Sequence, residues 1–230
     1  SESASSFMRA QFFTEHDDLK ADIEKKPMLA FDSDFLRWML SDGAGAAYLS
    51  REKNTDGLSL RIDWIENISY AGQLETCQYG GGVKKEDGSM VGWRETESID
   101  PELRKHLFAV KQDIKLLDRE IVKTAIDWAL ARVIQKHQLT PEDIDWYLPH
   151  YSSGYFREKF YGRMKEIGFE IPYEKWFTNL PTKGNTASAA IYIIIEDIFK
   201  AGRLKEGQKL LCFIPESGRF SHCYMMLTVV

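Results

Sequence analysis

The fold is decided by the stretch Lys183-Gly184-Asn185-Thr186-Ala187-Ser188-Ala189-Ala190. Gly184 permits a tight backbone turn, and the side-chain oxygens of Asn185 and Thr186 can accept from the free N–H groups that open a helix. The small residues that follow let this helix end pack closely against a neighbour. The apolar run at residues 191–199 predicts a buried helix that stops at Gly202. The stretch alone favours a capped core helix, and a chemical role for Asn185 at the helix mouth is the competing interpretation.

Strands and helices alternate on both sides of this stretch. Residues 114–137 repeat apolar side chains at three- and four-residue steps and predict the clearest helix. Thr140-Pro141-Glu142-Asp143 resembles a helix-start box with proline in the first turn. A second helix is predicted at residues 155–167, and strands are predicted at residues 144–148, 209–214 and 224–230, the last two joined by a tight turn at 215–220. This alternation is typical of a layered α/β fold.

The first hundred residues are less regular. Residues 7–26 are mixed and charged and favour helix or loop. The small-residue run at 41–49 predicts a strand whose backbone approaches a neighbour closely, and residues 57–68 alternate apolar and polar side chains as a strand does. Residues 70–93 are polar and rich in glycine. They lack the flanking strand and helix start that a phosphate loop needs, so a long surface loop is predicted.

Composition narrows the functional classes. The 230 residues are 43% hydrophobic, which is enough for a large core. The net charge of -5 offers no bulk electrostatic case for nucleic acid. The three cysteines have no paired spacing, so neither a disulfide framework nor a metal site is indicated, and a reducing cytoplasm is expected. No apolar run reaches the ~20 residues that span a bilayer, so no membrane span is expected.

Two polar residues stand where chemistry is expected. His150 follows a predicted strand and precedes a predicted helix, and Asn185 lies at the next helix start. Strand ends and helix starts are where ligands bind in α/β sheets. A neutral imidazole and a carboxamide can both donate hydrogen bonds to a developing oxyanion without adding net charge. A single histidine is also often a packed or surface residue, so these positions alone do not decide between the two interpretations.

Several motifs together resemble the β-ketoacyl-acyl-carrier-protein synthase III family. They are Leu148-Pro149-His150, the Gly-Asn-Thr-Ala-Ser-Ala-Ala run from Gly184, the turn Lys205-Glu206-Gly207, the glycine turn near the C-terminus, and Ser-Asp-Gly-Ala-Gly-Ala-Ala at residues 41–47. Their order and spacing agree over nearly the whole chain. The resemblance implies the thiolase fold, a duplicated αβαβα arrangement. Residues 1–105 would be the remainder of its N-terminal half, with a long loop at 70–98, and residues 106–230 its C-terminal half.

The same resemblance implies an active site of Cys, His and Asn. His150 and Asn185 would take the last two roles, and the Gly218 N–H would help to form the acyl oxyanion hole, although a plain tight turn explains Gly218 equally well. The implied reaction is Claisen-type C–C bond formation between acyl thioesters, in fatty acid or polyketide biosynthesis. The substrates would be acyl-carrier-protein or coenzyme A thioesters, with no cofactor and no metal, and the resemblance suggests a homodimer of complete subunits.

The nucleophilic cysteine is the main departure from that family. Its position would precede Ser1, and none of Cys77, Cys212 and Cys223 matches it. The first interpretation is therefore a condensing acyltransferase whose cysteine comes from an upstream segment or a partner chain. The alternative is a non-catalytic subunit that pairs with an active homologue. In either case a missing partner segment should leave apolar sheet surface bare.

Smaller departures concern substrate and partner. Ser153 stands where the family usually has asparagine, which puts contacts to the pantetheine arm in doubt. Residues 216–221, Glu-Ser-Gly-Arg-Phe-Ser, replace a Gly-rich turn and resemble ketosynthases of dialkylresorcinol and aryl-polyene pathways. A basic group on the predicted helix after His150 would suit docking of an acidic acyl carrier protein, and a solvated helix face explains it as well. This basic group consists of Arg157, Lys159, Arg163 and Lys165.

Overall fold

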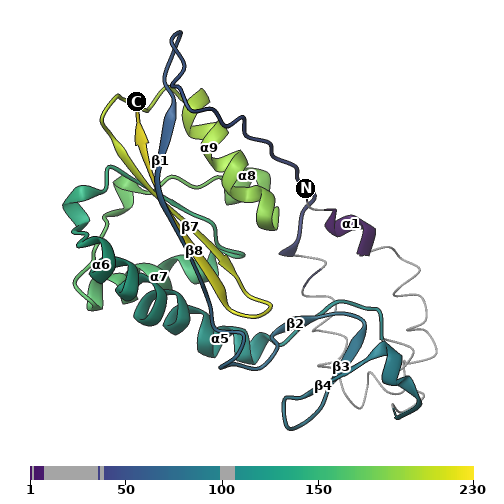
Figure 1. The fold of residues 1–230 in the computed structure, drawn as a ribbon. Coiled ribbons are helices and arrows are strands. Elements are labelled where there is room, and N and C mark those ends of the chain that lie inside the picture. The colour runs from purple at the N-terminus through teal and green to yellow at the C-terminus, as the bar shows by residue number, and fades with distance from the viewer. Residues whose placement is uncertain (2, 8–35, 37–38, 99–106) are drawn as a thin grey trace.

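The computed structural model describes residue 1, residues 3–7, residue 36, residues 39–98 and residues 107–230. At its centre is a four-stranded sheet made of β1 (Leu60–Ser69), β6 (Trp146–Pro149), β7 (Lys209–Glu216) and β8 (Ser221–Val229). The strand order is β1-β8-β7-β6. β6 and β7 are parallel, and β8 is antiparallel to both β1 and β7 (Figure 1). All four strands lie where the sequence predicts strands.

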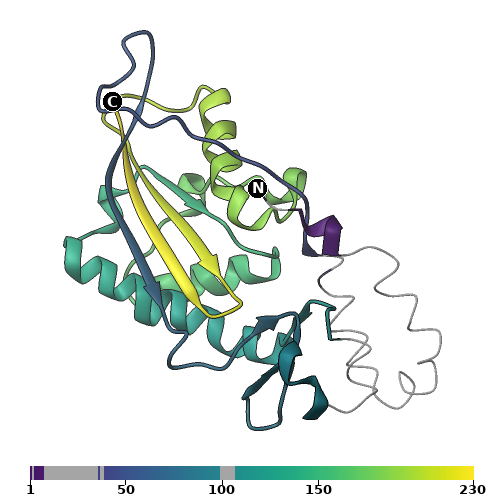
Figure 2. The ribbon, with the colours of Figure 1, turned by 45° about the vertical axis from the view of Figure 1, so that its right-hand side comes forward.

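Helices cover both faces of this sheet (Figures 1 and 2). One face packs against α5 (Ile114–Val122), η4 (Lys123–Leu130), α6 (Ala131–His137) and α7 (Tyr155–Glu166), which contribute to the larger core. The other face packs against α9 (Ala190–Lys200), whose Ile194 and Ile198 share a core with Leu210 and Cys212 of β7. Because successive side chains of a strand point to opposite faces, covering both faces buries the middle of β7 completely. The predicted α/β layering is confirmed.

The clearest predicted helix is a single helical run at residues 114–137, formed by α5, η4 and α6. Asp113 caps its start, because one carboxylate oxygen accepts from the Leu116 N–H at 2.9 Å. Its middle part, η4, is a π-helical stretch. There the hydroxyl of Tyr224 in β8 donates to the carbonyl of Ala125 at 2.9 Å. This buried bond ties the helix to the sheet.

The remaining elements are short. They are α1 (Ala4–Phe7), β2 (Gln78–Tyr79), β3 (Gly82–Lys84), β4 (Met90–Gly92), η3 (Trp93–Ser98), β5 (Lys111–Gln112), η5 (Pro141–Asp143), η6 (Tyr173–Lys175), α8 (Leu180–Lys183) and η7 (Ala187–Ala189). The helix-start box at Thr140 is confirmed, since Thr140 and Asp143 cap each other around η5. The helix or loop predicted at residues 7–26 lies, beyond Phe7, outside the described residues.

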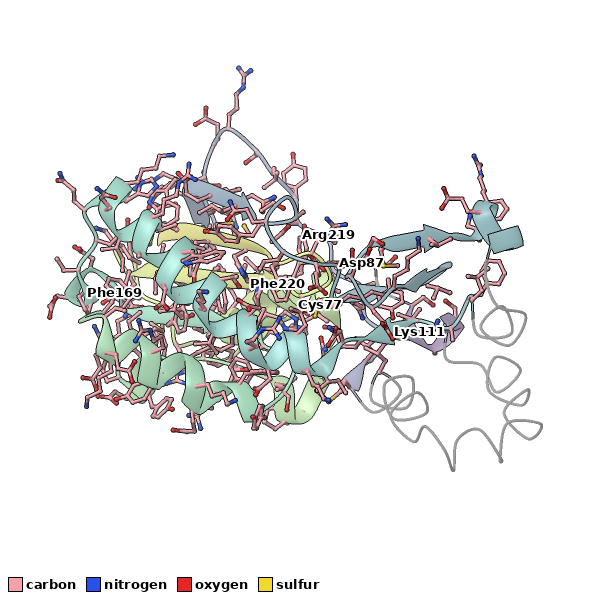
Figure 3. All side chains as sticks on the ribbon, turned by 90° about the horizontal axis from the view of Figure 1, so that it is seen from below. Cys77, Asp87, Lys111, Phe169, Arg219 and Phe220 are labelled. Carbon is pink, nitrogen blue, oxygen red and sulfur yellow. The ribbon has the colours of Figure 1, made fainter. Side chains whose placement is uncertain are left out.

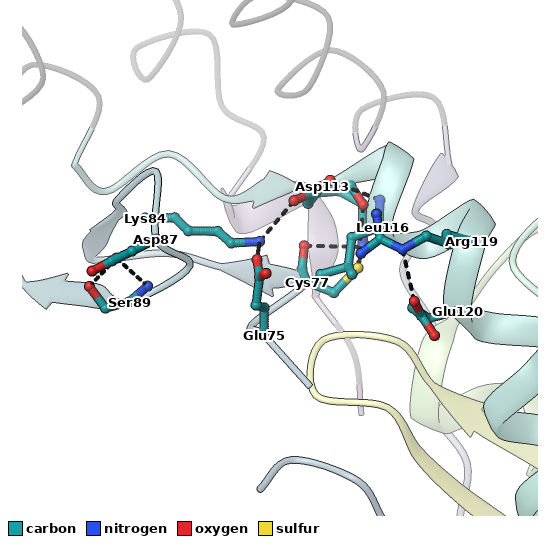
Figure 4. A network of polar contacts seen from close by, with 10 residues as sticks. Glu75, Cys77, Lys84, Asp87, Ser89, Asp113, Leu116, Arg119 and Glu120 are labelled. Carbon is teal, nitrogen blue, oxygen red and sulfur yellow. Dashed lines mark hydrogen bonds and ion pairs between the residues drawn. The ribbon is translucent and has the colours of Figure 1, made fainter. Parts of the chain in front are cut away.

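The surface loop predicted at residues 70–93 is a wrong prediction in part. β2 pairs with β5, β3 pairs with β4, and Cys77 is fully buried. Lys84 joins these pieces, because its Nζ lies 2.7 Å from a carboxylate oxygen of Glu75 and 2.8 Å from one of Asp113 (Figure 4). The local composition of residues 70–93 does not reveal a pairing with residues 111–112, which are distant in the chain.

The strand predicted at residues 41–49 is also wrong, because this segment forms no strand. It runs beside α9 instead (Figures 1 and 2). The close approach predicted from its small residues is present: a Cβ on Gly43 would lie 2.6 Å from the Cβ of Thr186, and one on Gly45 would overlap Tyr192. The glycines therefore serve packing against a helix and its preceding turn, rather than pairing along a sheet.

β1 lies at an edge of the sheet and carries exposed apolar side chains. It precedes residue 106, so the sheet spans the predicted boundary between residues 1–105 and 106–230. Ile62 and Ile65 pair with Leu227 and Met225, which face α9, yet their own side chains are 42% and 54% exposed. α9 thus covers only part of its face of the sheet. Bare apolar sheet surface of this kind is what the sequence led us to expect.

Candidate active site

β6 positions His150. The strand ends at Pro149, and the His150 N–H continues the pairing by donating to the carbonyl of Phe213 in β7 at 2.8 Å. The side chain is 7% exposed, and among the described residues its ring has no hydrogen-bond partner. The backbone of His150 is therefore fixed by the sheet, while both ring nitrogens are left for a ligand.

The turn before α9 positions Asn185. Gly184 adopts φ 74° and ψ -175°, a conformation open essentially to glycine alone. The Asn185 side-chain oxygen accepts from the Ala187 N–H at 3.0 Å, and its backbone carbonyl accepts from the Ser41 N–H at 2.8 Å. With its oxygen held in this way, the carboxamide keeps its NH₂ group as the available donor. The predicted acceptor role of Asn185 at the helix start is confirmed, whereas Thr186, which directly precedes η7, makes no side-chain cap bond.

His150 and Asn185 line one cavity of about 310 Å³. Helices α5 and α7 supply much of its apolar wall. The apolar lining residues are Leu36, Met39, Leu40, Leu117, Ile121, Phe156, Phe160, Ala187, Ile214 and Pro215, and the polar ones besides His150 and Asn185 are Gln78, Gln112, Tyr151, Ser152, Ser188, Glu216 and Ser217. An apolar cavity with a few convergent polar groups is typical of small-molecule sites.

Gly218 stands at the turn between β7 and β8, next to lining residues but not among them. Its N–H donates to a carboxylate oxygen of Glu216, and its carbonyl accepts from the Cys77 N–H at 2.8 Å. In the structure as it stands, the N–H assigned to an oxyanion hole already has an acceptor. The role of Gly218 in stabilising an oxyanion stays a prediction.

Burial sets the protonation state of the histidines. Loss of solvation lowers the pKa of His150 to about 4, and it lowers the pKa of His222, buried beside Thr124, to about 3. Neutral imidazole is therefore the form of His150 throughout the physiological pH range. A neutral ring can donate from one nitrogen and accept at the other, which is the form that the oxyanion role requires.

Acid should destabilise the fold for the same reason. As pH falls from 6.5 towards 4, the unfolded chain binds protons at these two histidines that the folded chain does not, so the free energy of unfolding falls. The slope from each histidine is at most about 1.4 kcal/mol per pH unit. Chemical denaturation between pH 7 and 4.5 measures it, and His150→Gln should make the dependence shallower. An unchanged slope in that variant would contradict a depressed pKa for His150.

The three cysteines are unsuited to act as nucleophiles. Burial raises the pKa of the Cys77 thiol to about 12, and the Asp113 carboxylate near it (Figure 4) adds to the shift. The Cys77 sulfur lies 2.9 Å from Nε2 of Gln112. Burial also raises the pKa values of Cys212 and Cys223. The thiolate is the reactive form, so all three are inert at neutral pH. None of them lines the cavity.

The basic group on α7 is largely neutralised within the chain. Lys159 pairs with Asp118 at 2.5 Å, Arg163 with Asp127 and Glu166 at 2.5 Å each, and Lys165 with Glu170 at 3.4 Å. Arg157 stacks on the ring of Tyr173.

The described part of the chain contains no group of three or more potential metal-ligating side chains. It also contains no helix long and apolar enough to cross a membrane.

Sequence reasoning missed most of the cavity wall. Phe156 and Phe160 lie one helical turn apart on α7, a spacing that predicts a common face. The same spacing is typical of ordinary core packing, so it did not distinguish the two roles. Gln112 lines the cavity because β5 pairs with β2. No local sequence pattern predicts that pairing.

Comparison with known proteins identifies the family that the chain resembles. The family model described as 3-Oxoacyl-[acyl-carrier-protein (ACP)] synthase III C terminal matches residues 134–215, which include His150 and Asn185. The β-ketoacyl-[acyl-carrier-protein] synthase III of Prochlorococcus marinus is 30% identical over 177 residues, covering 76% of this chain and 46% of the relative. That of Caldanaerobacter subterraneus is 31% identical over 176 residues, covering 75% and 46%.

A solved structure gives the same result for the fold. The β-ketoacyl-[acyl-carrier-protein] synthase III of Thermus thermophilus matches with a TM-score of 0.53 at 20% identity, over 73% of this chain and 46% of the other. The fold is therefore the α/β thiolase fold. The chain spans about half the length of the curated relatives it matches. It belongs to the β-ketoacyl-acyl-carrier-protein synthase III family of the thiolase superfamily, and it corresponds to a C-terminal portion of that family's proteins.

Proposed function

We propose that this chain is part of a condensing acyltransferase that joins two acyl thioesters by Claisen-type C–C bond formation. One observation carries the proposal: His150, held neutral by burial, and Asn185, with its NH₂ group left as a donor, line the same largely apolar cavity. A merely structural pair has no need to converge on a cavity. Membership of a family of condensing acyltransferases supports the same conclusion.

The proposed reaction begins on a sulfur from outside these residues. A cysteine thiolate attacks a thioester carbonyl and expels the donor thiol, leaving an acyl-cysteine. A malonyl-type thioester then loses carbon dioxide to form an enolate, and the enolate carbon attacks the acyl-cysteine and releases the thiolate. His150 and Asn185 would donate to the enolate oxygen, whose charge exists only along the reaction path. The substrates would be acyl-carrier-protein or coenzyme A thioesters, and no step needs a metal or cofactor.

A second function is favoured by the state of the cysteines. All three are buried or half-buried with raised thiol pKa values, so these residues alone supply no nucleophile. A non-catalytic ketosynthase-like subunit, paired with an active homologue, needs none. The presence of both His150 and Asn185 at the cavity supports the first function, because a scaffolding subunit has no use for them.

The mass of the native protein distinguishes the two functions. The preparation is incubated with an acyl coenzyme A and analysed intact. A continuous segment, or a co-purifying chain too short to be a complete homologue, whose thiol gains one acyl group would support the acyltransferase. A stable species of 26.6 kDa that never becomes acylated, alone or beside a complete homologue that does, would support the non-catalytic subunit.

The bare surface of β1 supports a partner segment that carries the cysteine. Ile62 and Ile65 lie on the face that α9 covers only in part, and exposed apolar patches mark interaction sites. We expect Ile65→Lys to weaken association with this segment at least about tenfold, which corresponds to about 1.4 kcal/mol. Titration of the separated parts, or co-purification yield, measures the effect.

Tyr155→Lys is the matched control for that prediction. Tyr155 is a large side chain, 58% exposed, on α7 at the other side of the sheet. Its replacement should leave association unchanged. Equal association of the Ile65 and Tyr155 variants would exclude β1 as the contact surface.

Carrier-protein docking on α7 is a weaker part of the proposal. Lys159, Arg163 and Lys165 each pair with a carboxylate of this chain, and such pairing reduces the field that an acidic partner would meet. Arg157, stacked on Tyr173, pairs with no carboxylate among the described residues. By analogy with complete family members, the assembly would be a dimer.

A further inference from the structure

The turn between β7 and β8 binds a carboxylate of its own chain. The Gly218 N–H donates to Oε1 of Glu216, and the Arg219 N–H donates to Oε2 of the same side chain at 3.1 Å. Two successive backbone N–H groups thus hold the two oxygens of one carboxylate. Successive N–H groups that converge in a turn form an anion-binding concavity. The turn therefore has the donor geometry of an oxyanion site, and Glu216 fills it.

The backbone that carries the N–H donors is held in place, whereas the Glu216 carboxylate can move. The Gly218 carbonyl accepts from the N–H groups of Cys77 and Gln78 at 2.8 and 3.3 Å, and Gly218 is buried. Figure 3 shows Arg219 and Phe220 beside Cys77 in this region. The Glu216 residue is exposed, so its side chain can rotate into solvent. A Cβ at position 218 would lie 2.5 Å from Oε1 of Glu216, so a side chain there would force the carboxylate to shift.

The turn also adjoins the cavity of His150 and Asn185, because Pro215, Glu216 and Ser217 belong to the cavity wall. An amide N–H carries a single hydrogen. It cannot donate fully to the Glu216 carboxylate and to a substrate oxyanion at the same time. The carboxylate and a tetrahedral oxyanion share the features that matter to these donors, namely negative charge and an oxygen acceptor.

The Gly218 N–H is the oxyanion donor that the family resemblance implies, and we propose that Glu216 is an internal competitor for this N–H and for that of Arg219. An acyl thioester must then displace the carboxylate before its own oxyanion is stabilised. Glu216 acts through these N–H groups and is a positioning residue rather than a catalytic one. The effect of Glu216 on acyl transfer rests on the function proposed above, whereas its occupation of the site does not.

Acylation of the complete enzyme tests the effect on rate. Glu216→Ala and Glu216→Gln are compared with Glu206→Gln, a replacement at an exposed glutamate in the turn before β7. Single-turnover transfer from octanoyl coenzyme A to the cysteine is followed by intact mass. We expect Glu216→Ala to acylate at least fivefold faster than the control, and Glu216→Gln less so, because the Gln oxygen still accepts. Acylation no faster than the control in either variant would overturn the proposal.

Acetate binding by the 230-residue chain tests the site without any reaction. Acetate is titrated at constant ionic strength while the amide signals of Gly218 and Arg219 are followed by NMR. In Glu216→Ala both signals should shift saturably, with a dissociation constant at least fivefold lower than in the unaltered chain. Equal dissociation constants, or no shift in either protein, would overturn the proposal. Acetate binding to the variant in an enzyme that never acylates would refute the proposed function and leave the oxyanion site standing.

Discussion

Alanine at His150 or Asn185 is expected to stop condensation in the complete enzyme while acylation of the cysteine persists. Both side chains would donate to the enolate oxygen, and the acylation step forms no enolate. Removing one oxyanion donor costs about 10²–10³-fold in rate. We therefore expect each variant to lower the rate of condensation at least about 100-fold. Acyl-enzyme, measured by intact mass, and condensed product, measured separately, give the two rates.

Asn185→Asp separates the chemical role from the structural one. The Asn185 oxygen caps the Ala187 N–H, and aspartate keeps that acceptor while losing the NH₂ donor. We expect this variant to fold normally and to condense as poorly as Asn185→Ala. His137→Ala is a control for His150, because His137 lies beside Trp64 and Glu66, away from the cavity. Condensation at the unaltered rate in His150→Ala and Asn185→Ala would show that the two roles are wrongly assigned.

Alanine at Gly184 is expected to destabilise the fold and to displace Asn185. Gly184 has φ 74° and ψ -175°, and holding a residue with a side chain there costs roughly 1–3 kcal/mol. The added Cβ would also overlap the Ser41 hydroxyl and lie 3.1 Å from the Ser41 Cβ. We expect the free energy of unfolding to fall by at least about 2 kcal/mol. Equilibrium denaturation measures this loss.

A double-mutant cycle with Ser41→Gly divides that loss into its parts. Glycine at position 41 removes the overlapping atoms, so it should recover the steric part in the double variant but not the backbone part. Gly72→Ala is the matched control, since nothing lies within 4 Å of a Cβ built there. Its effect should be small. Stability of Gly184→Ala equal to that of Gly72→Ala would contradict the importance of the Gly184 conformation.

Local sequence patterns predict those parts of the site whose structure depends on a short stretch of the chain. Strand β6, the turn at His150 and the cap at Asn185 follow from apolar runs and helix-start residues. The helix at residues 114–137 follows from its apolar period. Even so, the apolar period does not indicate the π-helical stretch within this helix, where the Tyr224 hydroxyl of β8 donates to the Ala125 carbonyl.

Most of the parts that sequence did not predict depend on distant partners. Residues 41–49 have the composition of a close-packed strand, but what they pack against is a helix. Cys77 lies in a glycine-rich region and is nonetheless buried, because β2 pairs with β5. The engagement of Gly218 by Glu216 is a side-chain contact within a turn, and residue types alone do not distinguish it from an open glycine turn.

The burial of the cysteines has a practical consequence for labelling chemistry. Cys77 and Cys212 are inaccessible, and Cys223 is half-buried, each with a thiol pKa above its ordinary value. An iodoacetamide-type electrophile reacts with thiolates, so at neutral pH this portion of the protein should remain almost unmodified. Any alkylated cysteine found in a native preparation then identifies, by peptide mapping, the polypeptide that brings a reactive sulfur to the assembly.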